Sequence, residues 1–227
     1  MPILALDTSS SVAVAVLSDS GDALATASSD EPRRHAELLA PMIARALADA
    51  GVDRRDLTAV VAGTGPAPFT GLRVGLVTAR TLALVLGIPA WGVPSLDGLA
   101  AAAARDAPGA ARVVVVTDAR RREVYWTSYR VGADGPPEPD EGPDIATPAA
   151  LRVSGRLAGA LVVGRGALVH RAELGLPDEP ALRDPDPVDL GRLALARHAA
   201  GVPLPTEPLY LRRPDAEPPA APKKVLA

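Results

Sequence analysis

The sequence predicts an α/β protein with two related lobes, each built on a mixed sheet, and three observations lead to this prediction. The first is a strand–Asp–turn–strand unit near the start, residues 3–17, in which an apolar run ends in Asp7. The second is a repeat of this unit at residues 113–129, where Asp118 ends the run. The third is a long apolar helical segment between them, residues 71–86. An internal repeat of this kind indicates a duplicated architecture.

The composition limits the classes of protein to consider. The 227 residues suffice for one large or two small domains, and 48% hydrophobic with 22% charged residues fits a soluble globular protein. The formal net charge of −3 argues against nucleic-acid binding by overall electrostatics. There is no cysteine, which excludes disulfides and thiolate metal sites. Because the start lacks the basic region of a signal peptide and the apolar runs are short, we expect a cytoplasmic protein without a membrane association.

The first fifty residues predict an antiparallel meander followed by a helix. The predicted strands are residues 3–7, 12–17 and 23–27. Residues 34–50 place their apolar side chains on one helical face, and Gly51 would end this helix. Pro41 lies inside it and removes one backbone hydrogen bond, so we expect a kink there.

The segment at residues 57–87 predicts a buried strand, a Gly/Pro turn and a long apolar helix. Thr70 is the expected N-cap, and Gly87 is expected to end the helix in a left-handed conformation. Arg73 and Arg80 interrupt the apolar run and need an acidic, carbonyl or solvent partner. Small residues recur at every fourth position: Gly71, Gly75, Ala79 and Ala83. This small-residue stripe allows another backbone to approach closely, and the spacing leaves open whether that backbone belongs to the same chain or to a partner.

The second half predicts a similar series of elements. Residues 89–93 are expected to form a strand and residues 95–105 a helix, before the repeated unit. The Pro-rich, acidic segment 132–148 is expected to be a mobile loop. Thr147 and Pro148 resemble the N-cap and first residue of a short helix. A strand at residues 160–163 and a helix at residues 188–200 are expected to follow.

These elements predict three divisions of the chain: an N-terminal lobe, residues 1–105, a smaller C-terminal lobe, residues 106–213, and a disordered tail, residues 214–227. Because matching units open the two lobes, we expect Asp7 and Asp118 to face each other across the cleft between them. A hydroxyl-rich turn with an aspartate at its base can hold a phosphate and a hydrated Mg²⁺. The competing interpretation is a plain Asp-Thr-Ser turn that satisfies its own backbone.

Two halves opened in this way resemble the actin, Hsp70 and sugar-kinase (ASKHA) architecture, and the detailed motifs resemble the TsaB (YeaZ) family. Four stretches carry this resemblance: LALDTS at residues 4–9, RHAELLAPM at 34–42, GPAPFTGLRVG at 65–75 and DARRREVY at 118–125. The closing PLYLR at residues 208–212 fits as well. Proteins of this bacterial family are needed to make threonylcarbamoyladenosine at position 37 of tRNAs that read ANN codons.

The resemblance implies a subunit without catalysis of its own. The catalytic relative, TsaD, has a similar N-terminal half but carries a metal-binding His-x-x-x-His pair, whereas here His35 is followed by Leu39 at the second position. The chain is also too short for the larger second lobe of TsaD. The resemblance therefore implies a scaffold that binds TsaD, with TsaE as a third component, and meets tRNA only through the complex. It implies no resident cofactor and no metal, with at most weak ATP or ADP binding at the partner interface.

The resemblance also places partner binding on the two apolar helices. The residues expected to bind are His35, Leu38, Leu39, Met42, Ile43, Leu72, Gly75, Leu76, Ala79 and Ala83. An exposed apolar patch is costly, so the isolated protein is expected to form a homodimer through the same surface, and homodimer and heterodimer would exclude each other. A leucine at Gly75 is expected to weaken both while leaving the fold largely intact.

The cleft between the lobes is expected to be a degenerate nucleotide site formed by Asp7, Thr8, Ser9, Asp118 and Arg120. A phosphate loop needs exposed N–H groups and small residues, but bulky Arg120 stands in the second turn, where an actin-like ATPase has glycine. The turn at residues 65–69 also departs from the family form. Ala67 stands where glycine is common, and Pro68, which has no N–H, stands where serine is common.

Two other classes of function stay open at this point. A glycoprotease-type metallopeptidase would need a metal-ligand set, for which neither a histidine pair nor a cysteine is available. A small phosphotransferase of the ASKHA fold could use Asp7, but it would need a glycine-bearing second phosphate turn. Metal content and ATP turnover of the purified chain would distinguish these classes from a scaffold.

Overall fold

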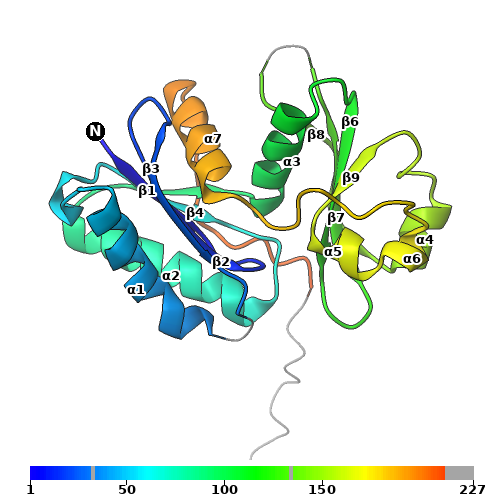
Figure 1. The fold of residues 1–227 in the computed structure, drawn as a ribbon, viewed down its shortest axis with the longest axis horizontal. Helices are drawn as coiled ribbons and strands as arrows, with labels where there is room; N and C mark the ends of the chain where they lie inside the picture. The colour runs from blue at the N-terminus through cyan, green and yellow to red at the C-terminus, as the bar shows by residue number, and fades with distance from the viewer. Residues whose placement is uncertain (32–33, 133–134, 213–227) are drawn as a thin grey trace, which may run out of the picture.

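The computed structural model describes residues 1–31, 34–132 and 135–212, and it contains two mixed sheets that stand side by side (Figure 1). The first sheet has five strands in the order β3-β2-β1-β4-β5, and the second has four in the order β8-β7-β6-β9. The first-sheet strands are β1 (Ile3–Asp7), β2 (Val12–Leu17), β3 (Ala23–Ser29), β4 (Val60–Gly63) and β5 (Ala90–Val93). The second-sheet strands are β6 (Arg112–Asp118), β7 (Val124–Arg130), β8 (Glu138–Ala146) and β9 (Leu161–Val163).

The two sheets share one plan of strand pairing. Strand β1 pairs antiparallel with β2 and parallel with β4. Strand β6 likewise pairs antiparallel with β7 and parallel with β9. In each sheet the hairpin therefore turns back directly after an aspartate, Asp7 in the first and Asp118 in the second. The duplication inferred from the sequence is present in the topology.

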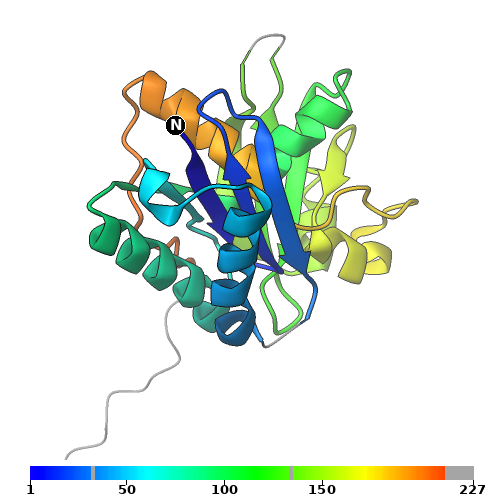
Figure 2. The same cartoon turned by 60° about the vertical axis from the view of Figure 1, so that its left-hand side comes forward.

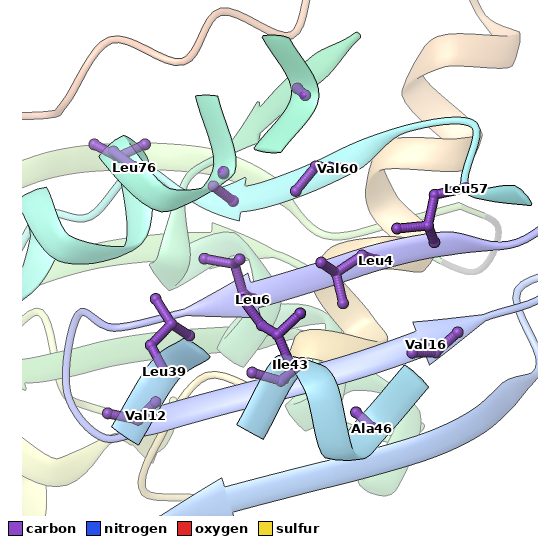
Figure 3. Close-up of a cluster of buried hydrophobic side chains, with 14 of the residues drawn as sticks. Leu4, Leu6, Val12, Val16, Leu39, Ile43, Ala46, Leu57, Val60 and Leu76 are labelled. Atoms are coloured by element: carbon purple, nitrogen blue, oxygen red, sulfur yellow. The ribbon is translucent and has the colours of Figure 1, made fainter. Parts of the chain in front are cut away.

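The first sheet is covered on both faces, which explains why its central strands are apolar throughout. Alternate side chains of a strand point to opposite faces. Leu4 and Leu6 therefore pack with the helices α1 (His35–Asp49) and α2 (Phe69–Leu86), whereas Ile3 and Ala5 pack with helix α7 (Pro187–Ala199). Figure 3 shows Leu39 of α1 beside Leu6 in the first of these two cores.

Two helices pack on the sheet of the other half of the chain. Helix α3 (Ser95–Asp106) follows the first sheet in sequence but packs its leucines on β6, β7 and β9 of the second sheet. Helix α7 follows the second sheet but packs on the first. Both lie between the sheets in Figure 1. The predicted lobe boundary at residue 105 stays a prediction, and the structure adds that each half supplies a helix to the other.

The remaining helices are short. They are the 3-10 helix at Arg54–Asp56, α4 (Pro148–Val153), α5 (Arg165–Val169) and α6 (Arg171–Leu174). As predicted, the Thr147 hydroxyl caps α4 by accepting from the Ala150 N–H at 3.2 Å. Gly87 ends α2 with φ of 69°, also as predicted.

Two local expectations are wrong. Residues 138–146 form the edge strand β8 instead of a loop; prolines are tolerated there because one side of an edge strand needs no partner. Thr70 lies inside α2, whose N-cap is Pro68 and has no side-chain cap. Helix α1 continues through Pro41, and the kink expected there stays a prediction. The predicted tail from residue 214 lies outside the described residues.

Helix α2 is long and apolar enough, by length and composition alone, to cross a membrane. Its buried residues Leu72, Leu76 and Ala79 instead belong to the core of the first sheet. The side chains of its two arginines form hydrogen bonds with the segment that follows α7. Arg73 donates to the Tyr210 hydroxyl at 2.9 Å, and Arg80 donates to the Thr206 hydroxyl at 2.9 Å. The helix is therefore an integral element of the α/β domain.

Candidate functional site

The turn after β1 is built around the buried carboxylate of Asp7. Its Oδ1 accepts from the Ser9 N–H at 2.7 Å and from the Ser9 hydroxyl at 2.5 Å, and its Oδ2 accepts from the Ser95 hydroxyl at 2.6 Å. Gly63 is required beside it, because a Cβ there would overlap the Asp7 carboxylate. Burial raises the pKa of the Asp7 carboxyl above its ordinary value of 3.8, although the bonds from Ser9 and Ser95 oppose this shift.

Thr8 ties this turn to helix α2. Its hydroxyl donates to the Gly71 carbonyl at 2.8 Å and accepts from the Gly75 N–H at 3.1 Å. A Cβ at Gly71 would lie 2.9 Å from the Thr8 carbonyl oxygen, and one at Gly75 would overlap the Thr8 hydroxyl. The small-residue stripe therefore serves close packing within the chain, which is the first of the two interpretations that the spacing left open.

The turn after β6 repeats this geometry with different chemistry. Asp118 Oδ1 accepts from the Arg120 N–H at 2.9 Å, just as Asp7 accepts from Ser9 two residues on. Asp118 is partly exposed, and its Oδ2 lies 3.2 Å from the Arg120 guanidinium. Arg120, Arg121 and Arg122 all have positive φ, at 62°, 55° and 61°. The second turn therefore presents cationic side chains where the first presents hydroxyls.

A cavity of about 340 Å³ brings the two turns together. It is lined by Thr8, Ser9, Ser10, His35, Ala36, Pro68, Thr70, Gly71, Val74 and Arg120. Three residues predicted for the cleft, Thr8, Ser9 and Arg120, thus meet in one space. Asp7 and Asp118 are not among the lining residues, because each carboxylate is held by its own turn. Their predicted position facing each other stays a prediction.

His35 is the third kind of polar side chain in this cavity, beside the hydroxyl groups and Arg120. Its Nε2 lies 3.4 Å from the Ser10 carbonyl oxygen, and its expected role at the partner surface stays a prediction. Within residues 1–31, 34–132 and 135–212, no group of three or more His, Cys, Asp or Glu side chains is placed to hold a metal. The cavity offers hydroxyl, imidazole and guanidinium groups, which suit an anion or a hydrogen-bonding ligand better than a cation.

The sequence did not indicate several polar contacts between distant segments, two of which, Ser10–Asp184 and Asp30–Arg165, join the two halves of the chain. The Ser10 hydroxyl donates to Asp184, which also pairs with Arg165; the Arg165 guanidinium reaches Asp30 at 3.1 Å. Arg212 pairs with Glu123 in the second turn. These partners lie far apart in sequence, so local patterns carried no signal for them.

Comparisons with known proteins point to one family. Residues 29–158 match the family model of TsaD, tRNA N6-adenosine threonylcarbamoyltransferase. An uncharacterized protein of Mycobacterium tuberculosis is 43% identical over 189 residues, which cover 83% of this chain and 80% of that protein. TsaB of Escherichia coli, a tRNA threonylcarbamoyladenosine biosynthesis protein, is 37% identical over 135 residues, 60% of this chain and 58% of that protein. YeaZ from Pseudomonas aeruginosa matches in structure with a TM-score of 0.75 at 32% identity, covering 92% of this chain and 99% of that one.

The chain belongs to the TsaB (YeaZ) family. This membership confirms the resemblance drawn from the four motifs. It also confirms the predicted actin-like fold, since the YeaZ structure matches over nearly the whole chain and both sheets share the hairpin-plus-parallel-strand plan. Named TsaB proteins act in tRNA threonylcarbamoyladenosine biosynthesis.

The helices that the family resemblance marked for partner binding turn most of the predicted residues inward. Leu39, Ile43, Leu72, Gly75, Leu76, Ala79 and Ala83 are buried, and all but Gly75 belong to the core on the first sheet. Leu38 and Met42 are half-buried. What this TsaB-family protein exposes on α2 is the opposite face, with Val77 at 61%, Leu84 at 82% and Val85 at 76% exposure.

Substituting Asp7 by asparagine tests the raised pKa of this carboxyl. Between pH 3.8 and the raised pKa, the folded TsaB-family protein holds more protons than the unfolded chain, so Asp7 makes stability fall as the pH rises through that window. The Asp7→Asn variant lacks this contribution. Its free energy of unfolding, relative to the unmodified protein, should therefore increase as the pH rises from about 4 to about 7 in urea titrations.

Asp19 provides a control of opposite sign. It is exposed, and its hydrogen bond and attraction to the N-terminal amino group lower the pKa of its carboxyl. Asp19 therefore contributes stability above its ordinary pKa, and this contribution is lost as the pH falls. Asp19→Asn should lose stability relative to the unmodified protein as the pH rises toward 3.8, and the difference should then stay nearly constant from about pH 4 to about pH 7. A pH-independent difference for Asp7→Asn would show that the Asp7 carboxyl is not perturbed in the folded state.

Proposed function

We propose that this protein is a non-catalytic subunit that binds TsaD, with TsaE as a third component, and supports threonylcarbamoyl transfer to adenosine 37 of ANN-decoding tRNAs in the cytoplasm. The transfer from the threonylcarbamoyl adenylate to the adenosine amine would belong to TsaD. The isolated protein would form a homodimer through the surface that TsaD occupies. ATP or ADP would bind at most weakly, at the interface with TsaD.

The observation that carries this proposal is the apolar outer face of α1 and α2. A groove of about 400 Å³ runs between the two helices, and none of its lining residues is charged: Ala40, Ile43, Val77, Thr78, Thr81, Leu82 and Val85. Leu84 is also exposed beside it. Figure 2 shows that both helices lie on the side of the first sheet that faces away from the second sheet. Large exposed apolar patches are features of protein interfaces.

The match to the TsaD model supports TsaD as the partner. The matched residues 29–158 include both helices of the outer face, so TsaD has a related helix pair. Two related helix pairs can pack about a two-fold or pseudo-two-fold axis, in which the same patch on each chain contacts its counterpart. This arrangement accounts for both the homodimer and the heterodimer and makes them compete.

The cavity supports a role without catalysis. Arg120 occupies the second turn, where a phosphate-binding turn needs a small residue. The Asp7 carboxylate is engaged by Ser9 and Ser95, so it is not directed to a metal in the cavity. The competing class is a phosphotransferase of the same fold. Rapid ATP turnover by the purified chain that is abolished in Asp7→Ala would favour that class over a scaffold.

The double variant Val77→Glu/Val85→Glu tests the proposed partner surface. TsaD binding would remove water from the two new carboxylates in the groove. We therefore expect the affinity for TsaD to fall by at least about 100-fold, roughly 2.7 kcal/mol. Isothermal titration with TsaD from the same genome would measure the affinity. Light scattering should show the isolated variant as a monomer.

A matched control uses the same substitutions elsewhere. Val153 and Val169 are also exposed valines, but they lie on α4 and α5 beside the second sheet. Val153→Glu/Val169→Glu should bind TsaD with unchanged affinity. If the groove variant is folded and binds TsaD as tightly as this control does, the outer face of α1 and α2 is not the partner surface.

A further inference from the structure

The hairpin that joins β6 and β7 has an unusual backbone. Arg120, Arg121 and Arg122 follow one another in the left-handed region, with φ of 62°, 55° and 61°. In the part of the chain that the structure describes, every other residue with positive φ is a glycine. Left-handed conformation brings the Cβ of an L residue close to its carbonyl oxygen, so three successive non-glycine residues in it carry considerable strain.

Three hydrogen bonds that close this hairpin use backbone donors. The Ala119 N–H donates to the Glu123 carbonyl at 2.9 Å, and the Glu123 N–H donates to the Arg120 carbonyl at 3.0 Å. The Arg120 N–H completes the turn with Asp118. All three bonds use backbone donors, so glycine at these positions would keep them and relieve the strain. Strained backbone of this kind is typically kept where the side chains have a function.

The three arginines extend a local cluster of positive charge. Arg121 and Arg122 are exposed, and Arg212 joins the hairpin through its pair with Glu123 and its bond to the Ala119 carbonyl at 3.2 Å. Arg120 pairs with Asp118 and Arg212 with Glu123, and Arg121 and Arg122 add two exposed guanidinium groups to the same hairpin, in a chain whose net charge is −3. In Figure 1 the hairpin projects at the lower edge of the second sheet, on the same side as the starts of α1 and α2.

We infer that the Arg120–Arg122 hairpin tip contacts the phosphate backbone of the tRNA when this protein is assembled with TsaD, and this inference rests on the proposed function. A guanidinium group matches a phosphate with two parallel hydrogen bonds and keeps its charge at every physiological pH. Contacts of this kind position the RNA without reading its sequence. Because the chain as a whole is acidic, these contacts add to those of TsaD and give only weak binding by themselves.

The double variant Arg121→Ser/Arg122→Ser tests this inference in the assembled complex. Affinity for an ANN-reading tRNA transcript would be measured by fluorescence anisotropy at a series of salt concentrations. Each phosphate contact contributes about 0.7 to 0.9 to the slope of log affinity against log salt. We therefore expect the slope to become shallower by roughly 1.5 and the affinity to fall about 10-fold at low salt. TsaD binding should be unchanged.

Three further variants separate charge from structure. Arg54 and Arg55 are an equally exposed arginine pair before β4, so Arg54→Ser/Arg55→Ser should keep the unmodified slope. Arg121→Lys/Arg122→Lys keeps the charge and should restore most of the slope. Arg121→Gly/Arg122→Gly should make the salt slope of tRNA binding as shallow as in the serine variant. It should also raise the melting temperature, because glycine relieves the left-handed strain.

The outcomes distinguish this inference from the proposed function. If the serine variant keeps the slope of the Arg54/Arg55 control, the tip does not contact tRNA. If the serine variant loses TsaD affinity but keeps the slope, the tip contacts the protein partner and the inference is overturned. If the unmodified chain does not bind TsaD, the proposed function fails. In that case the same tRNA titration is carried out at low salt with the isolated chain. Equal salt slopes for the unmodified chain and the serine variant would overturn the inference that the hairpin tip contacts tRNA.

Discussion

Replacing Gly75 by leucine is expected to destabilise the fold strongly, whereas the small-residue stripe alone suggested that the fold would be spared. The Cβ of any larger residue would overlap the Thr8 hydroxyl, and Leu6 packs directly behind it. That hydroxyl bonds both the Gly71 carbonyl and the Gly75 N–H, so pushing it away would leave buried polar groups without partners. Overpacking and the lost bonds together should cost about 3 to 5 kcal/mol.

Urea unfolding followed by circular dichroism would measure this loss. Val77→Leu is the matched control, because Val77 lies two residues away on the same helix with its side chain exposed. Surface substitutions of this kind change stability by about 0.5 kcal/mol or less. A Gly75→Leu variant that unfolds within about 1 kcal/mol of the unmodified protein would mean that α2 does not pack on the Asp7 turn in this way. Loss of TsaD binding by Gly75→Leu would carry no information about the partner surface.

Asp97→Ala is expected to have an effect of similar size, because Asp97 joins three elements. It lies on α3 and accepts from the Tyr129 hydroxyl of β7 at 2.7 Å and from the Arg197 guanidinium of α7 at 2.7 Å. Tyr129 is fully buried, and burial, together with the Asp97 charge, raises the pKa of its hydroxyl well above 10.0. Removing the carboxylate leaves a buried hydroxyl and a largely covered cation unpaired, at a cost of about 3 kcal/mol.

The change should also weaken the coupling between the two sheets. Helix α3 packs on the second sheet and α7 on the first, so Asp97 links them at their crossing. We expect the Asp97→Ala variant to unfold with a shallower urea dependence, the sign of a less cooperative transition. Asp97→Asn keeps a side chain that can bond both partners and should lose about half as much stability.

Asp106→Ala is the control for this experiment. Asp106 lies at the end of the same helix and pairs with Arg105 at the surface. Its loss should change the free energy of unfolding by about 0.5 kcal/mol or less. Equal stability of the Asp97→Ala and Asp106→Ala variants would show that the Tyr129–Asp97–Arg197 network does not join the sheets.

Local patterns in the sequence were sufficient for most elements and for the internal repeat. Apolar runs placed β1 and β2, and an apolar helical face placed α1, because burial on both faces of a strand or on one face of a helix selects apolar residues at those positions. The two Asp turns were visible because each aspartate must accept from a backbone N–H two residues later. The motifs around these turns also identified the family.

Only the tertiary structure decided which surface each element faces. The spacing of Gly71 and Gly75 marks a close approach, but it does not name the backbone that approaches, which is the turn at Thr8. Edge strand β8 forms because β7 offers its free side, a condition that no local pattern in an acidic, Pro-rich segment contains. Likewise, the placement of Arg120 in one cavity with His35, and of α3 and α7 on opposite sheets, depends on pairings across many tens of residues. Neighbouring residues in the sequence determine the local helix, strand or turn, whereas the residues that a side chain contacts in space depend on how the whole chain packs.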